Sequence, residues 1–143
     1  MRKSAGVIIV LNNDKMLLAH PSNSRWENSY SFPKGGIEKD ETKLDAAIRE
    51  LREETSVVVS VDQIKNIDEP IIVDYNDKKG DIYKRLYLYL VYINDISEVG
   101  LDSIIIPTEN LQIEEVDWAG FLTKSEASDK IFYRCKHLLD IIE

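Results

Sequence analysis

A glycine turn followed by a strongly patterned acidic segment constrains this chain more than any other feature. Just before the segment, Phe32-Pro33-Lys34-Gly35-Gly36 combines a proline with two glycines, which favours a rigid turn where the backbone can approach a ligand. Between residues 42 and 55, the side chains that would pack against a core recur at helical spacing: Leu44, Ala47, Ile48, Leu51 and Thr55. We therefore expect a loop and a helix that form one unit.

The remaining surface of this predicted helix gathers carboxylates. At about 100° per residue, Glu50, Glu53 and Glu54 fall on one flank, and Arg49 and Arg52 turn to the opposite flank. Like charges three or four residues apart destabilise a helix by roughly a few tenths of a kcal/mol per pair, unless a cation lies between them. Clustered carboxylate oxygens suit Mg²⁺ or Mn²⁺ better than a metal that prefers thiolate or imidazole. An acidic helix face alone is more often a solvated surface, but the full spacing favours a metal site.

The spacing of residues 35–57 resembles the signature box of the Nudix hydrolases (MutT-like), which cleave a nucleoside diphosphate linked to another group. The positions that match are Gly35, Glu41, Arg49, Glu50, Leu51, Glu53, Glu54 and Val57. Ser56 departs from the pattern, because the family carries a glycine there. If the backbone at this position needs a positive φ, serine costs roughly 1 kcal/mol relative to glycine.

The resemblance implies a role for each box residue. The carboxylates of Glu50, Glu53 and Glu54 are expected to hold Mg²⁺ or Mn²⁺. The backbone carbonyl of Gly35 or Lys34 is expected to help them. Arg49 is expected to pair with Glu41, which holds the loop onto the helix and aims Glu53. The expected catalytic set is then Glu53, Glu50, Arg49 and Glu41.

The reaction that the resemblance implies is attack of water on phosphorus, with a carboxylate that takes the proton. Members of the family differ in which carboxylate is this base. Glu53 is the best match within the box. Glu114 and Glu115, just before Val116-Asp117-Trp118, are the alternatives from a later loop.

Positive charge and aromatic rings indicate where a substrate would bind. An acidic protein that binds polyphosphate needs local cations, for which the chain offers Arg25, Lys34, Lys84 and Arg85. Tyr75 lies downstream of the box where the diadenosine polyphosphate hydrolases of the family tend to carry a tyrosine. Tyr87 belongs to an alternating strand, where it either stacks a base or packs in the core. Trp26 either lies near the site or anchors its loop on the sheet.

These residues rank dinucleoside polyphosphates first among the substrates. ADP-ribose, other nucleotide sugars and 5′-triphosphate RNA ends follow as alternatives. A catalytically weak Nudix module that binds a nucleotide without turnover is a further alternative, for which Ser56 is the only hint. An acidic structural domain with an unused charged helix is the third class of hypothesis.

The composition limits the partners and the compartment. The 143 residues, 43% of them hydrophobic, predict a single domain over 1–143. A net charge of −8 disfavours non-specific binding to nucleic acid or to an anionic membrane. The apolar run after the N-terminus is too short for a signal peptide or a membrane span, so we expect a cytoplasmic protein. Cys135 is expected to pack as a small hydrophobe, and the oligomeric state, monomer or homodimer, stays open.

The order of elements predicts an α/β protein. Strands are expected near residues 5–11, 15–20, 57–64, 71–75, 82–93 and 116–122, and helices over 42–55 and 125–142, the second with Thr123 and Glu126 as a capping box. Such an order gives a mixed sheet between helices. It agrees with the α/β/α sandwich and catalytic loop-helix-loop that the Nudix resemblance implies.

Overall fold

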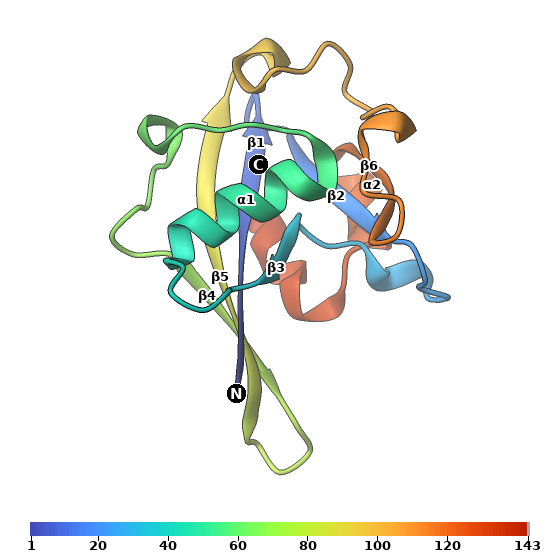
Figure 1. The fold of residues 1–143 in the computed structure, drawn as a ribbon. Helices are drawn as coiled ribbons and strands as arrows, with labels where there is room; N and C mark the ends of the chain where they lie inside the picture. The colour runs from blue at the N-terminus through green and yellow to red at the C-terminus, as the bar shows by residue number, and fades with distance from the viewer. Residues whose placement is uncertain (143) are drawn as a thin grey trace.

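The computed structural model describes residues 1–142, which form a mixed six-stranded sheet (Figure 1). The strands are β1 (Arg2–Leu11), β2 (Lys15–Pro21), β3 (Lys34–Gly36), β4 (Ile71–Asn76), β5 (Ile82–Ile93) and β6 (Val116–Thr123). Five of them follow the order β4-β5-β1-β2-β6, and β3 pairs with β1. β1 and β5 run parallel, whereas the other pairs are antiparallel. The predicted mixed sheet is confirmed.

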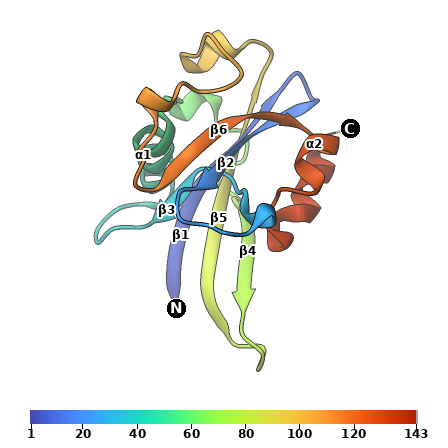
Figure 2. The same cartoon turned by 90° about the vertical axis from the view of Figure 1, so that its right-hand side faces the viewer.

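Helical segments cover both faces of this sheet (Figure 2). Helix α1 (Lys43–Thr55) lies on one face, and α2 (Lys124–Ser128) with the 3₁₀ segment Tyr133–Ile141 lies on the other. The predicted α/β/α sandwich is therefore confirmed. No helix within residues 1–142 is both long enough and apolar enough to cross a membrane.

The central strand β1 is apolar on both sides because it separates two cores. Val7 and Ile9 belong to the core under α1, and Ile8 and Val10 belong to the core under the C-terminal segments. All four side chains are fully buried. A strand buried on both faces reads as a continuous apolar run, and this run is what the sequence shows after Gly6.

Helix α1 is capped at both ends. At its start, the hydroxyl of Thr42 accepts a hydrogen bond from the backbone N–H of Asp45 at 3.1 Å. At its end, Ser56 adopts the left-handed conformation with φ 65°. Its hydroxyl donates to the carbonyl of Asn110 at 2.6 Å, a bond that a glycine could not make. Serine at the family's glycine position thus fastens the end of α1 to a later loop.

The predicted strand at residues 57–64 was wrong. Val57 and Val59 are buried and Val58 is exposed, which gives the alternation that predicted a strand. The backbone, however, forms only an isolated bridge, between Ile64 and Val91. Residues Val61–Gln63 form a 3₁₀ turn, which is capped by the preceding serine. An alternating pattern makes a strand only where a neighbouring strand is free to pair.

The continuous helix predicted over residues 125–142 was also wrong, although the capping box that begins it is confirmed. Helix α2 ends at Ser128. The backbone that follows it forms hydrogen bonds with the loop between β2 and β3. The N–H of Tyr30 donates to the carbonyl of Lys130 at 2.9 Å, and the N–H of Phe132 donates to the carbonyl of Tyr30 at 2.8 Å. These bonds replace the helical ones, and the chain resumes as the 3₁₀ segment, where Cys135 is buried as expected.

Candidate active site

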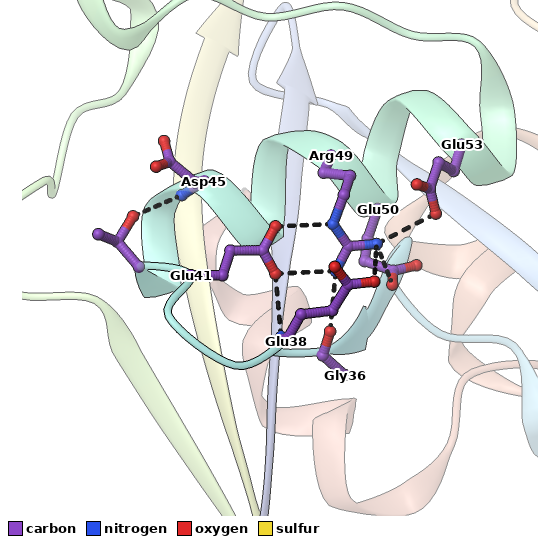
Figure 3. Close-up of polar contacts among 8 residues, drawn as sticks. Gly36, Glu38, Glu41, Asp45, Arg49, Glu50 and Glu53 are labelled. Atoms are coloured by element: carbon purple, nitrogen blue, oxygen red, sulfur yellow. Dashed lines mark hydrogen bonds and ion pairs between the residues drawn. The ribbon is translucent and has the colours of Figure 1, made fainter.

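Arg49 lies at the centre of the acidic face of α1 (Figure 3). Its guanidinium donates to Glu41 at 2.7 and 2.9 Å. It also donates to Glu50 at 2.9 Å, to Glu53 at 3.1 Å and to the carbonyl of Gly36 at 3.0 Å. The expected pair with Glu41 is present. The expectation that Arg49 points away from the glutamates was wrong, because residues four apart on a helix are neighbours.

Glu41 joins the glycine loop to the helix. One of its oxygens accepts the backbone N–H of Glu38 at 3.0 Å in addition to its bonds from Arg49. The hydrogen bond from Arg49 lowers the pKa of Glu41, so this carboxylate stays ionised. Arg49 and Glu41 therefore join the glycine loop, Glu50 and Glu53 in one hydrogen-bond network.

Glu54 is the buried member of the acidic group. The backbone N–H of Lys34 donates to its Oε1 at 3.1 Å. The pKa of Glu54 is raised to about 7, mainly by burial, with smaller contributions from the carboxylates of Glu50 and Glu115. Burial also raises the pKa of Glu50 despite its bond from Arg49. Both groups hold oxygen atoms in a place where a cation would favour the ionised form.

Gly35 lies directly against Glu50. A Cβ atom built at Gly35 would collide with the carboxylate of Glu50. A glycine is therefore required if the loop backbone and this carboxylate are to share one small space. The expected proximity of the Gly35 backbone to the glutamates is present.

An acidic cleft of about 310 Å³ collects these groups. It is lined by Lys34, Gly35, Gly36, Glu38, Arg49, Glu50, Glu53, Glu54, Gln112 and Glu115. Of the two loop glutamates that the sequence offered as a base, Glu115 lines the cleft and Glu114 does not. The loop before β6 thus brings one carboxylate to the cleft that the helix lines.

The chemistry of these donors fits a hard divalent cation. Carboxylate oxygens and a backbone carbonyl are the ligands that Mg²⁺ and Mn²⁺ prefer. Within residues 1–142, no three His, Cys, Asp or Glu side chains are already arranged as metal ligands. The Arg49 guanidinium forms ion pairs with Glu50 and Glu53. A metal ion therefore has to compete with Arg49 for these two carboxylates.

A second cavity, of about 540 Å³, adjoins the acidic cleft and carries positive charge. Arg2, Lys34 and Lys84 line it, together with Glu54 and Glu115 on the side of the cleft. Arg2 and Lys84 are neighbours because they are paired in the parallel register of β1 and β5. Burial and then the charges of Lys34 and Arg2 lower the pKa of Lys84 to about 8. This crowding of cations indicates a site for an anion.

Ser31 adds a polar group to the wall of the same cavity. Its side-chain oxygen is buried and has no hydrogen-bond partner within residues 1–142. Buried hydroxyls nearly always have a partner, and the group beside this oxygen is the buried Cys135 thiol, on whose pKa Ser31 acts. Sequence reasoning missed both Arg2 and Ser31. Neither carries a local signal, because the pairing of β1 with β5 and the fold of the loop bring them to the cavity.

Two of the predicted cations lie elsewhere. Arg25 lines a separate cavity of about 390 Å³ with His20, Trp26 and Tyr30, and it does not line the acidic cleft. Arg85 donates to Asp74 at 2.6 and 3.0 Å across β4 and β5, so its charge is already paired. Lys34 and Lys84 remain as the predicted cations that the fold brings to the carboxylates.

The two tyrosines predicted to contact substrate are buried on opposite sides of the sheet. Tyr75 stacks on Phe132 with ring centroids 5.6 Å apart, and Lys84 Nζ lies 4.9 Å from the centre of the Tyr75 ring. Tyr87 packs in the core under α1, with Lys43 Nζ 4.4 Å from its ring centre. Neither ring lines the cationic cavity. Tyr75 contacts it only through Lys84.

Known proteins share sequence and fold with this chain. The family model described as the NUDIX domain matches residues 1–135. The chain is 35% identical over 90 residues to an RNA pyrophosphohydrolase of Pelagibacter ubique (strain HTCC1062), an alignment that covers 61% of this chain and 54% of that protein. The chain thus spans about half the length of this curated relative.

Solved structures share the fold over the whole chain. An Ap4A hydrolase of C. elegans in a binary complex has a TM-score of 0.69 at 22% identity, with 99% of this chain and 94% of that chain covered. A MutT NUDIX hydrolase from Burkholderia pseudomallei has a TM-score of 0.71 at 16% identity, with 99% and 98% covered. At such low identity these structures support the fold alone.

Proposed function

The chain belongs to the NUDIX domain family, and on this premise we propose that it is a metal-dependent pyrophosphohydrolase that cleaves a phosphoric anhydride bond of a nucleotide. The observation that carries this proposal is the wall shared by the acidic cleft and the cationic cavity. Five residues line both: Lys34, Gly35, Gly36, Glu54 and Glu115. A polyphosphate along this wall would meet cations on one side and metal-binding oxygens on the other.

The glutamates of α1 differ in exposure, and we assign their roles on this basis. We propose that Glu50, Glu53 and Glu54 hold the metal ion, with the Gly35 backbone beside them. When bound, Mg²⁺ or Mn²⁺ neutralises charge on the pyrophosphate and lowers the pKa of water. Arg49 limits the freedom of Glu50 and Glu53, so both carboxylates stay within reach of the phosphate chain.

Glu53 is the proposed general base. Its side chain is 42% exposed, the most open of the three glutamates that Arg49 contacts most closely, so water reaches it. Glu115 is the second candidate because it faces the same cleft from the loop before β6. Glu114 does not line this cleft, which supports Glu115 over Glu114 as the loop base.

For the substrate, we propose dinucleoside polyphosphates first. The net charge of −8 disfavours a long polyanion, while Arg2, Lys34 and Lys84 concentrate cations in one cavity suited to a short phosphate chain. The 5′-triphosphate end of RNA is the second candidate, favoured by the name of the Pelagibacter relative. ADP-ribose and other nucleotide sugars carry fewer phosphates and rank after both.

The proposal is tested by chromatography of products from a nucleotide panel. The panel contains diadenosine tetraphosphate, ADP-ribose, nucleoside triphosphates and 5′-triphosphate RNA, each with Mg²⁺ and with a chelator. We expect metal-dependent cleavage by the wild type and by Glu69→Gln, an exposed control outside the cleft, and loss of cleavage in Glu53→Gln. No product from any substrate would reject the hydrolase, and tight binding without turnover would favour a nucleotide-binding module.

A further inference from the structure

Two large exposed aromatic side chains line a cleft outside the site described above. Trp26 is 74% exposed and Tyr133 is 62% exposed. The cleft between them measures about 350 Å³ and is also lined by Asn28, Ser29 and Phe132. Exposed rings that face one apolar cleft leave a large hydrophobic area in water. A planar apolar ligand would remove that area from water on both faces.

The cleft is formed before any ligand binds, because both of its walls are fastened. On the loop side, the hydroxyl of Ser29 donates to the carbonyl of Trp26 at 2.7 Å. On the other side, the rings of Phe132 and Tyr133 lie 4.9 Å apart, and the Arg134 guanidinium lies 5.1 Å from the centre of the Tyr133 ring. Figure 2 shows the loop between β2 and β3 beside the C-terminal segment.

The cleft lies beside the cationic cavity, although no residue among 1–142 lines both. Ser29 lines the cleft and Ser31 lines the cavity. The residue between them, Tyr30, is extended, so the Cα atoms of Ser29 and Ser31 are about 7 Å apart. On the far wall, Phe132 stacks on Tyr75, the ring over which the cavity's Lys84 lies. The cleft and the cavity are therefore neighbours, both along the loop and across the Phe132–Tyr75 stack.

We propose that Trp26 and Tyr133 clamp the nucleobase of the second nucleoside of a dinucleoside polyphosphate, whose phosphates lie in the cationic cavity. This assignment rests on the proposed function. Every nucleobase has a flat π face that stacks on tryptophan and tyrosine. The amide of Asn28 supplies donors and an acceptor at the edge of the same cleft.

The charges beside the cleft favour this small ligand over an RNA chain. An RNA body needs a run of cations for its phosphates. The neighbouring cavity offers Arg25 and Lys130, but Glu27 and Asp129 line it as well. A dinucleoside polyphosphate needs no cations outside the cavity of Arg2, Lys34 and Lys84, because all its phosphates lie between the two nucleosides.

The test compares diadenosine tetraphosphate with adenosine 5′-tetraphosphate, which has the same number of phosphates and lacks the second nucleoside. Trp26→Ala and Tyr133→Ala should each raise KM for diadenosine tetraphosphate about tenfold and leave its kcat and the KM for adenosine 5′-tetraphosphate unchanged. Tyr92→Ala, which removes a tyrosine 42% exposed on β5 outside the cleft, should change neither. Equal effects on both compounds, or none, would overturn the clamp. Effects confined to 5′-triphosphate RNA would reassign the cleft to RNA.

A binding measurement separates failure of the clamp from failure of the proposed hydrolysis. Diadenosine tetraphosphate should quench the tryptophan fluorescence of the wild type more than adenosine 5′-tetraphosphate does, and Trp26→Phe should abolish the difference. Quenching without turnover would reject hydrolysis and keep the clamp. Turnover that does not depend on Trp26, with equal quenching by both compounds, would reject the clamp and keep hydrolysis.

Discussion

The two sides of the candidate site are built in different ways. We name Glu50, Glu53 and Glu54 the carboxylate wall, and Arg2, Lys34 and Lys84 the cation wall. The carboxylate wall lies on one helix and carries its own counter-ion, because Arg49 pairs with two of its members. By contrast, none of the ion pairs within residues 1–142 involves the cation wall. The side chains of the carboxylate wall are held in place by Arg49. Within this part of the chain, the cations of the other wall are not neutralised by an ion pair, so they can bind an anion.

If this contrast holds, substitutions on the carboxylate wall should lower kcat. Glu53→Gln should reduce kcat by about 10²- to 10⁴-fold, since it removes the proposed base. The circular dichroism spectrum should not change, because the side chain is 42% exposed. Glu41→Gln, which disturbs only the positioning of Arg49, should reduce kcat by less. Unfolding of Glu53→Gln would mean that the residue is structural.

The buried member of the carboxylate wall should make the stability of the metal-free protein depend on pH. The pKa of Glu54 is about 7 when folded, against 4.5 ordinarily, so its stabilising contribution is present below pH 4.5 and is lost as the pH rises through 7. The free energy of unfolding of Glu54→Gln, relative to that of the wild type, should rise by about 2 kcal/mol from pH 5 to pH 8. Urea unfolding with a chelator measures it. Mg²⁺ should stabilise the wild type most at high pH. A pH-independent gain would contradict this assignment.

Substitutions on the cation wall should instead act on binding. Lys84→Met removes a charge that faces the phosphate cavity and keeps much of the packing on Tyr75. We expect KM to rise about tenfold with kcat nearly unchanged, as for the loss of one charge-assisted hydrogen bond. Steady-state kinetics against the control Lys79→Met, in the exposed β4–β5 turn, would measure it. An equal fall in kcat would remove the distinction between the walls.

The smallest effect should come from the end of α1, behind the carboxylate wall. Ser56→Ala keeps the left-handed backbone and loses the bond to the Asn110 carbonyl, so it should destabilise the protein by about 1 kcal/mol. Ser56→Gly loses the same bond but relieves the backbone, so its net change should be close to zero. Thermal unfolding of both variants measures the difference. Equal destabilisation would show that the backbone conformation costs little.

The extent to which the sequence predicted the fold follows from how local each element is. The helix over 42–55 was predicted well because its cap, its apolar stripe and its end all lie within the segment. The strand expected at 57–64 and the long final helix failed, since both depend on distant partners. The segment 57–64 forms only an isolated bridge, to Val91. Hydrogen bonds with Tyr30 interrupt the helix expected over 125–142.

The same distinction holds for the candidate site. The family resemblance predicted the pair of Arg49 with Glu41. The bonds of Arg49 to Glu50 and Glu53 were not predicted, because helical spacing alone had placed Arg49 on the opposite flank. Arg2 reaches the site only because β1 and β5 pair in one particular register, which no local pattern specifies. The burial of Tyr75 likewise depends on Phe132, which arrives from the end of the chain.

The parallel pairing of β1 with β5 also sets the order in which the site can assemble during folding. The contact of Arg49 with Glu41 closes a short loop, whereas the contact of Arg2 with Lys84 closes a loop that contains the whole box. Loop closure over a longer chain costs more entropy and slows folding. A folding chain is therefore expected to gain its affinity for metal before its affinity for phosphate.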